Sequence, residues 1–153
     1  MAQEDKELLI KDLCARLPYG VKCYNRETET IFILSDVSDT DSDLPTFDYG
    51  FADIDDIKPY LRPMSSMTEE EKHDLLVTTV GIECVKYFQV LSDGSIDNTD
   101  AAHQDLYNFT MHWINFDGIN TTSYLDWLNA HHFDYRGLIK KGLAIDCTNL
   151  NIY

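Results

Sequence analysis

The chain has 153 residues, and chains of this length bury roughly 68–70% of their extended surface, which is enough for a hydrophobic core without disulfides. Hydrophobic residues make up 44% of the sequence and aromatic residues 12%, so the composition is that of a globular protein rather than a disordered one. Twelve basic residues against 27 acidic residues give a net charge of −15, which disfavours direct binding to nucleic acid or to an anionic membrane.

The acidic residues are unevenly distributed along the chain. From Glu27 to Ile57 there are ten acidic residues and no lysine or arginine. From Tyr87 to Tyr135 there are seven more, again without lysine or arginine. Because lysine and arginine make the contacts that displace counterions from phosphates, these two tracts favour a protein partner, one with a basic surface, over nucleic acid.

The amino-terminal stretch Met1–Glu7 is acidic and lacks the basic start and apolar run of a secretory signal. No stretch approaches the roughly 18 apolar residues of a membrane span, so we expect a cytoplasmic protein without membrane contact. The cysteines show no C-x-x-C pair and no histidine at zinc-ligand spacing, and in a reducing compartment we expect free thiols. They are Cys14, Cys23, Cys84 and Cys147.

The first predicted elements are a helix and a hairpin. Residues 4–17 place leucines at helical spacing, and Pro18 and Gly20 end the run, so this segment predicts a helix. The segments 20–24 and 28–34 are fairly rich in β-branched and aromatic residues and are separated by a polar stretch. They therefore predict two strands of a hairpin.

The next part of the chain predicts less regular structure. Residues 35–45 are polar and rich in aspartate, which is typical of a loop. Residues 47–51 could add a third strand to the hairpin. Pro59 and Pro63 follow and mark a short connector.

The middle of the sequence predicts a helix and then a strand. Thr68-Glu-Glu-Glu71 fits a capping box, in which the threonine oxygen accepts from the third amide and the glutamate reaches back, so a helix should begin there and run to about Val80. Residues 83–91 alternate in the manner of a buried strand. Residues 92–94 then predict a turn.

The last third predicts mostly helices. In 99–116 the large apolar residues step by three and four positions, which favours a helix, although Phe109, Met111 and Trp113 would also suit one face of a strand. Thr121 or Thr122 can cap a following helix that ends near His131. Asp134 can cap a last short helix.

These elements predict an α+β fold with a small, mainly antiparallel sheet packed with several helices, and with a helical carboxyl-terminal half. The sequence contains no internal repeat and no low-complexity segment, so we expect one globular domain over residues 1–153. We expect Trp127 and Leu128 to anchor the carboxyl-terminal helix in the core, because an aromatic side chain of this size dominates local burial.

Two segments imitate the opening of a calcium-binding loop, since oxygen ligands at alternate positions suit a hard cation. In Asp39–Asp43 the required glycine is replaced by Leu44, and in Asp93–Asp97 it is replaced by Asn98. A solvated loop and a turn explain the two segments more simply. We therefore predict no metal site in either.

His131 and His132, followed by Asp134, could form a metal site or an acid–base pair, because imidazole ligates metals and a carboxylate can fix its tautomer. Adjacent residues of a helix point apart, however, and a position near the last helical carbonyls is the more ordinary role. The sequence has no nucleotide-binding loop, nucleophile elbow, zinc-protease motif or catalytic-cysteine signature. An enzyme therefore has no positive support, and no cofactor is predicted.

Two groups of residues are the candidates for binding a partner. The first is the aspartate-rich loop, whose charges can steer a basic surface toward the protein. The second is the segment near the carboxyl end that combines histidine, acidic, aromatic and basic side chains. The residues are Asp39, Asp41, Asp43, His131, His132, Asp134, Tyr135 and Arg136.

Four segments carry a resemblance to a known family. The first, Tyr124–Ala144, combines tryptophan, two histidines and further aromatic residues in few positions, and the others are Leu13–Val21, Lys58–Lys72 and Lys86–Gly94. Together they resemble a family of small uncharacterised acidic proteins from phage-like and other mobile elements of gut bacteria. The resemblance runs nearly end to end. It implies a mobile-element context and brings no activity with it.

We therefore expect a non-enzymatic accessory or interaction protein of a mobile genetic element that acts by binding a protein partner, in an oligomeric state that the sequence leaves open. One alternative is an acidic mimic of nucleic acid that inhibits a host defence or replication protein, since a net charge of −15 can be steered to a basic groove. Another is an unrecognised enzyme or metal-binding protein, for which a pocket of clustered carboxylates and histidines would be the first sign.

Overall fold

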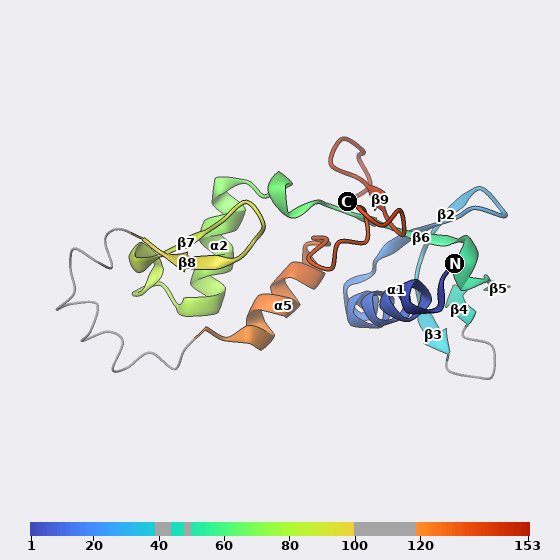
Figure 1. Ribbon diagram of the computed structural model, residues 1–153, viewed down its shortest axis with the longest axis horizontal. Coiled ribbons are helices and arrows are strands. Elements are labelled where there is room, and N and C mark those ends of the chain that lie inside the picture. Colours follow the sequence, from blue (N-terminus) through green and yellow to red (C-terminus); the bar gives the residue numbers. More distant parts are fainter. Residues whose placement is uncertain (39–43, 48–49, 100–118) are drawn as a thin grey trace. The chain divides into compact units, whose positions relative to one another are not determined.

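The structure is a computed structural model, and it describes residues 1–38, 44–47, 50–99 and 119–153. Within these ranges helices combine with small, mainly antiparallel sheets, so the predicted α+β class is confirmed (Figure 1).

The chain forms two compact units. Unit 1 comprises Met1–Pro63 and Asn129–Tyr153, and unit 2 comprises Met64–Leu128. A compact unit need not be a domain that folds by itself. The single domain expected over residues 1–153 therefore stays a prediction.

Unit 1 begins with the predicted first helix, α1 (Gln3–Arg16), which the 3₁₀ turn η1 (Leu17–Tyr19) continues. Its main sheet has four strands in the order β2-β1-β6-β9. Their bounds are β1 Lys22–Asn25, β2 Thr30–Ile33, β6 Ile57–Leu61 and β9 Ile145–Asp146. Strand β1 is antiparallel to β2 and to β6, and β9 is parallel to β6. The predicted hairpin is confirmed as β1 and β2.

The connector expected around Pro59 is wrong, because β6 is a central strand of this sheet. The register explains how a proline is tolerated there. The bond from the Arg26 N–H to the Asp56 carbonyl marks a hydrogen-bonded pair, and hydrogen-bonded pairs alternate with unbonded ones along an antiparallel ladder. Cys23 therefore faces Pro59 in an unbonded pair. Pairing with β9 begins only at Tyr60, so the missing amide hydrogen costs the sheet no bond.

The second sheet of unit 1 has three antiparallel strands, β3 (Asp36–Ser38), β4 (Leu44–Phe47) and β5 (Gly50–Phe51). The loop expected over 35–45 is therefore wrong at both ends, because pairing between β3 and β4 overrides the polar local composition. The strand expected over 47–51 is divided between the end of β4 and β5. Residues 39–43 lie outside the described residues.

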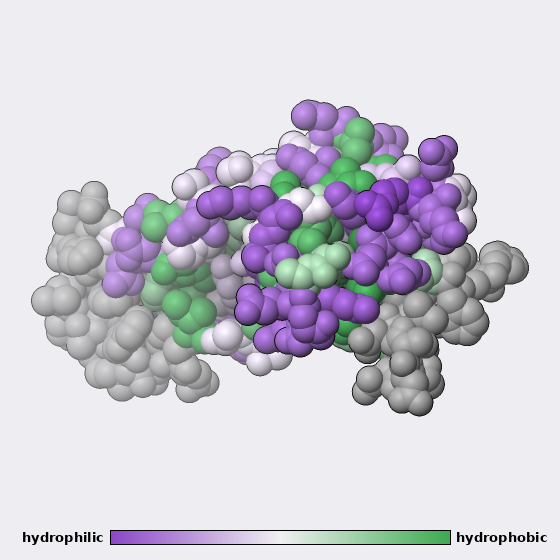
Figure 2. All heavy atoms as spheres, turned by 45° about the vertical axis from the view of Figure 1, so that its right-hand side comes forward, coloured by the Kyte–Doolittle hydropathy of each residue, from purple (hydrophilic) through white to green (hydrophobic). Residues whose placement is uncertain are grey.

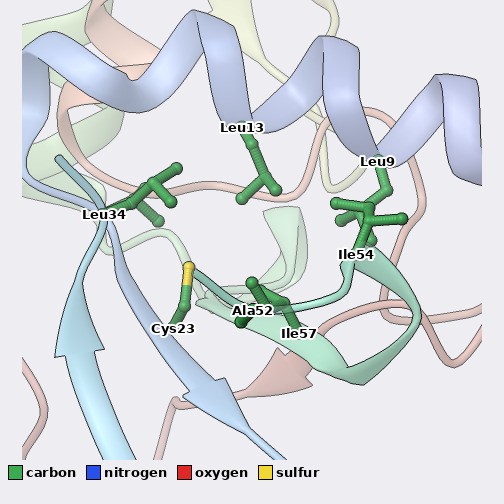
Figure 3. Close-up of a cluster of buried hydrophobic side chains, with 8 residues drawn as sticks. Leu9, Leu13, Cys23, Leu34, Ala52, Ile54 and Ile57 are labelled. Carbon is green, nitrogen blue, oxygen red and sulfur yellow. The ribbon is translucent and has the colours of Figure 1, made fainter. Parts of the chain in front are cut away.

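The main core of unit 1 lies between α1 and the sheet, as Figure 3 shows. Leu9 and Leu13 of α1 point toward buried side chains of β1, of β6 and of the 3₁₀ turn η2 (Ile54–Asp56). The full cluster is Leu9, Leu13, Val21, Cys23, Leu34, Ala52, Ile54 and Ile57. A smaller cluster joins the carboxyl-terminal segment to β6, and its buried members are Leu61, Leu138, Leu143 and Ala144. Burial of apolar surface thus holds α1 and residues 129–153 to one sheet.

Unit 2 contains the helix predicted after the capping box, α2 (Glu69–Val80). The Glu71 N–H donates to the Thr68 hydroxyl at 3.2 Å, and the Thr68 N–H donates to the Glu71 carboxylate at 2.8 Å, so the capping box is confirmed. The remaining elements are η3 Met64–Ser66, η4 Val85–Tyr87, β7 Phe88–Val90, β8 Ile96–Asn98 and α5 Thr121–Ala130, whose last two residues belong to unit 1.

The strand expected over 83–91 is shorter than predicted, because η4 precedes β7. Strand β7 pairs with β8 through the predicted turn, in which the Asp93 carboxylate accepts from the Ser95 N–H at 2.9 Å and from the Ser95 hydroxyl at 2.6 Å. Gly94 in this turn has a φ of 85°, which favours glycine, and a Cβ there would lie 1.9 Å from Met64 Cε, so any other residue would also have to displace the Met64 side chain. The helix expected over 99–116 falls, apart from its first residue, outside the described residues.

Helix α5 carries the predicted anchor residues. Trp127 and Leu128 are both buried, and Trp127 Nε1 donates a hydrogen bond to the Asp74 carboxylate of α2 at 2.7 Å. The predicted burial of both side chains is therefore confirmed, and the tryptophan also satisfies its only donor.

Two predicted helix boundaries near the carboxyl end are wrong. The cap of α5 is Asn120, whose side chain accepts from the Ser123 N–H at 3.0 Å, rather than one of the two threonines that follow it. The short helix expected after Asp134 is replaced by successive turns over 134–142. Gly137, with a φ of 74°, takes a left-handed conformation that interrupts a helix at that point.

Candidate functional site

A buried ion-pair group joins the carboxyl-terminal segment to α1 within unit 1. We call it the charged cluster, and it consists of Asp12, Arg16 and Arg136. Asp12 and Arg16 are fully buried, and Arg16 Nε and Nη2 donate to the Asp12 carboxylate at 2.7 Å and 3.1 Å. Arg136 Nη1 donates to the same carboxylate at 2.9 Å. One carboxylate therefore accepts from two guanidinium groups, one fully buried on Arg16 and one partly exposed on Arg136.

The charged cluster also holds the backbone and an aromatic side chain of the carboxyl-terminal segment. Arg16 Nη2 donates to the Phe133 carbonyl at 2.7 Å. The guanidinium carbons of Arg136 and Arg16 lie 4.5 Å and 5.6 Å from the centre of the Tyr135 ring, distances at which cations and aromatic faces attract. The Tyr135 hydroxyl donates to Asn129 Oδ1 at 3.0 Å. Burial raises the pKa of Tyr135, so the hydroxyl keeps its proton at neutral pH.

His132 is buried in a left-handed backbone conformation, with a φ of 57°, and its ring stacks on the ring of Tyr153 at 3.8 Å and an interplanar angle of 13°. Burial is the main cause that lowers its pKa, to about 4, and cationic neighbours lower it further. Those neighbours are Arg16, His131, Lys22 and Arg62. His132 is therefore neutral at pH 7. Its Nδ1 has no hydrogen-bond partner among the described residues.

Tyr153 inserts its hydroxyl between two strands of the main sheet. The hydroxyl accepts from the Lys22 N–H of β1 at 3.0 Å and donates to the Tyr60 carbonyl of β6 at 3.0 Å. The register would make Lys22 and Tyr60 the next hydrogen-bonded pair, so the phenol oxygen bridges the donor and the acceptor of that pair. Although the residue as a whole is half exposed, burial of the hydroxyl raises the pKa of Tyr153.

Asp134 organises the turn that replaces the expected last helix. Its two carboxylate oxygens accept from the Leu138 N–H and the Ile139 N–H, each at 2.8 Å. The Asp134 N–H donates to the Arg62 carbonyl at 2.7 Å, next to a parallel bridge between Arg62 and Phe133. The carboxylate therefore caps a turn, as an aspartate at a helix start would, and it fixes the path of the chain beside β6.

The structure thus gives most of the predicted partner-binding residues internal contacts within unit 1. The residues of the carboxyl-terminal segment lie in one neighbourhood, and there they are buried or half-buried: His131, His132, Asp134, Tyr135 and Arg136. The three aspartates of the acidic loop, Asp39, Asp41 and Asp43, lie outside the described residues. A role in partner binding stays a prediction for both groups.

The cysteines and the metal-binding side chains were the other candidates for chemistry. Burial raises the pKa of the Cys23, Cys84 and Cys147 thiols, which keeps them protonated and poorly nucleophilic at neutral pH. These three are free thiols, as expected, and Cys14 is exposed. Among the residues that the structure describes, no group of three or more histidine, cysteine, aspartate or glutamate side chains is placed to hold a metal ion.

A surface feature of unit 1 was not predicted. Ile31 and Ile33 of β2 are 52% and 54% exposed, although isoleucine is among the residues most often buried. With the end of the chain they line a shallow groove of about 290 Å³ on the sheet. We call the residues that line it the β2 patch, which consists of Lys22, Ile31, Phe32, Ile33, Asn151 and Ile152. Large exposed apolar side chains that lie together mark surfaces for binding.

The β2 patch lies on the edge of the main sheet. Within the described part of the chain, β2 pairs with β1 alone. Phe32 of this strand and Leu34, directly after it, point the opposite way, since Phe32 packs against the core under α1 and Leu34 is buried. The segment Thr30–Ile33 is readable from sequence as a strand. Its edge position is not, because that depends on how distant strands pair.

Hydrophilic residues cover most of the surface seen in Figure 2, and hydrophobic residues appear there only in small separate groups. No helix in the described ranges is both long and apolar enough to cross a membrane. Comparisons with family models, with curated proteins and with solved structures found no match for this chain. Function must therefore be inferred from the site itself.

Proposed function

We propose that this chain is a non-enzymatic accessory protein of a mobile genetic element, which acts in the cytoplasm by binding a protein partner through the β2 patch. The observation that carries the proposal is the exposure of Ile31 and Ile33 side by side on an edge strand. The mobile-element context comes from the resemblance of four sequence segments.

The apolar area and its position support a protein partner. Burying an exposed isoleucine fully is worth about 1.5–3 kcal/mol, so two half-exposed side chains leave roughly 2 kcal/mol of binding free energy unused in the isolated chain. A protein that exposes such residues on an edge strand also risks aggregation, and edge strands are normally protected against it. Strand Thr30–Ile33 contains neither a charged residue nor a proline. An edge strand without such protection is expected where a partner protein covers it.

The unusual residues near the carboxyl end have structural roles, which leaves the β2 patch as the candidate for partner binding. His132, Tyr135 and Arg136 contact α1, the sheet and each other, which explains their unusual density as a requirement of the fold. The pKa of His132, lowered to about 4, removes it as a general acid near neutral pH. Partner binding is therefore better assigned to the β2 patch than to this segment.

A second candidate function is an acidic mimic of nucleic acid that occupies the basic groove of a host defence or replication protein. The observation that favours it is the exposure of acidic side chains in the tract from 27 to 57. The exposed ones among the described residues include Glu27, Glu29, Asp36, Asp53 and Asp55. Binding of this kind acts through long-range fields that salt screens over roughly 10 Å at 0.1 M. Its affinity would fall steeply with ionic strength and would not depend on Ile31 or Ile33.

The experiment that tests the proposal compares partner capture by three forms of the full chain. The wild type, the double variant Ile31→Thr/Ile33→Thr and the control Ile82→Thr are used to capture proteins from a lysate of a natural host, and mass spectrometry identifies them. Threonine keeps the β-branched shape that suits a strand while removing apolar surface. Ile82 is 66% exposed and lies in unit 2, so its change is a matched loss of exposed isoleucine elsewhere.

The proposal predicts a protein that the wild type and Ile82→Thr capture equally and that the double variant fails to capture. A protein captured equally by all three forms, and released by moderate salt, would favour the mimic instead. Capture that depends on Ile82 rather than on Ile31 and Ile33 would place the binding surface in unit 2 and contradict the proposal.

A further inference from the structure

We propose that the partner binds the β2 patch as an extended strand with basic residues at its ends, which adds to the main sheet beside β2. This inference rests on the proposed function and deepens it by naming the kind of segment that is bound. Its basis is the direction in which the backbone groups of β2 point, together with the charges at the two ends of the strand.

The register of the hairpin sets the direction of those backbone groups. The Leu34 N–H donates to the Val21 carbonyl at 3.0 Å, which marks a hydrogen-bonded pair. Pairs alternate along an antiparallel ladder, so Ile33, opposite Lys22, is in an unbonded pair with β1. Ile31 follows two residues away and is unbonded to β1 for the same reason.

A residue that is unbonded toward one neighbour directs its N–H and carbonyl groups to the other side of its strand. Ile31 and Ile33 therefore present two N–H groups and two carbonyls along the open edge of β2. The same two residues carry the exposed apolar side chains. Backbone groups that can pair with a strand and side chains that can pack against it thus occur on the same residues, as strand addition requires.

The other edge of the sheet does not offer this combination. Strand β9 has only two residues, Ile145 and Asp146. A very short edge is one of the ways in which sheets avoid pairing with other chains. Strand β2 is twice as long, with four residues, and within the described ranges it pairs on one side alone, with β1.

The charges beside β2 select the chemistry of the occupant. Glu27 and Glu29 precede the strand, Asp36 follows it, and all three are exposed. Two basic residues lie in this neighbourhood. Arg26 donates to the Asp56 carboxylate at 2.7 Å, and Lys22 of the β2 patch donates through Nζ to the Ile152 carbonyl. Basic residues on both ends of an added strand would therefore meet carboxylates, while an apolar middle would cover Ile31 and Ile33.

A second copy of the chain is a poorer occupant of the same edge. Antiparallel pairing of β2 with itself would bring Glu27 and Glu29 of one copy alongside Asp36 of the other, and like charges on paired strands destabilise them. The two copies would also each carry a net charge of −15. A basic strand from a different protein gains from the same field that repels a second copy.

The test uses a synthetic nine-residue peptide with two lysines at each end and alternating valine and threonine between them. Its binding to the full chain is measured by fluorescence anisotropy, and exchange of the Ile31 and Ile33 amide hydrogens is followed by NMR. A second peptide has aspartate in place of the lysines. Two further peptides carry N-methyl groups on the valines or on the threonines, because N-methylation blocks one edge of a strand and leaves the other free.

The inference predicts that the lysine peptide binds and slows exchange of the Ile31 and Ile33 amides. It predicts at least tenfold weaker binding of the aspartate peptide. It also predicts that one N-methylated peptide loses at least tenfold in affinity while the other binds like the unmodified peptide. Equal binding of both N-methylated peptides, or binding without slower exchange at Ile31 and Ile33, would show side-chain contact without strand pairing and would overturn the inference.

A protein variant gives an independent measurement. The Ile33 N–H points away from β1, so Ile33→Pro removes an outward donor and no bond of the β1 ladder, provided that the melting temperature is retained. We expect this variant to bind the lysine peptide at least tenfold more weakly than Ile33→Thr does. If the lysine peptide does not bind while lysate capture still depends on Ile31 and Ile33, strand addition is wrong and the proposed function stands. If capture does not depend on those residues, the proposed function is wrong.

Discussion

Replacing Asp12 by asparagine tests whether the charged cluster holds the carboxyl-terminal segment to α1. The substitution keeps the size of the side chain and removes the one negative charge that balances Arg16 and Arg136 at distances of 2.7–3.1 Å. Arg16 is fully buried, so it cannot recover the lost interaction from water. Removing one partner of a buried ion pair typically costs about 3–5 kcal/mol. For a chain of this length that corresponds to a fall in melting temperature of about 8–16 °C.

The assay is thermal unfolding followed by circular dichroism, with Asp5→Asn as the control. Asp5 lies on the same helix and pairs with Lys141 of the same carboxyl-terminal segment at 2.8 Å, but both side chains are partly exposed. Pairs of that kind contribute little, so this variant should melt close to the wild type. If Asp12→Asn melted together with Asp5→Asn, the buried cluster would not stabilise the fold and the reasoning would be refuted.

Three further predictions concern stability. The pKa of His132 is lowered on folding from 6.5 to about 4, so protonation favours the unfolded state. The contribution of His132 to the free energy of unfolding should therefore be fully present above pH 6.5. Urea unfolding should show that free energy falling by about 2 kcal/mol between pH 7 and pH 5. His132→Asn, which tolerates the left-handed backbone, should show a smaller fall, and an equal fall would assign the effect to other groups. Trp127→Ala should cost about 3–5 kcal/mol, and an unchanged melting temperature would make α5 peripheral. Tyr153→Phe should speed amide exchange at Lys22, with little effect at Tyr24, and unchanged exchange at Lys22 would contradict the bridging role of the hydroxyl.

The elements that follow local signals could be predicted from the sequence, and those that depend on distant pairing could not. The capping box at Thr68 and the leucine spacing of α1 act within a few residues, and both appear as predicted. Strand β6 was missed because Pro59 is ordinarily a sign against a central strand. Only the register against β1, which leaves that position unbonded, makes the proline acceptable.

The same distinction applies to the candidate site. The segment around His132 and Tyr135 was singled out because its residue types are unusual, and the structure places these residues in contact with α1 and with Tyr153. Histidine, aromatic and charged residues are frequent there because polar and aromatic contacts hold the carboxyl-terminal segment to α1 and to the main sheet. Ile31 and Ile33 gave no such signal, because an isoleucine in a strand is usually a core residue, and exposure depends on which strand lies at the edge.

The most direct test of the account is the dissociation constant of the captured partner for the wild type and for Ile31→Thr/Ile33→Thr, measured by calorimetry at physiological salt. Removing about 1 kcal/mol of apolar contact at each position predicts a dissociation constant that is roughly 30-fold higher for the variant. The melting temperature of the variant must stay close to that of the wild type, since both side chains are half exposed. A dissociation constant unchanged by the double substitution would contradict the account, because the partner would then bind elsewhere.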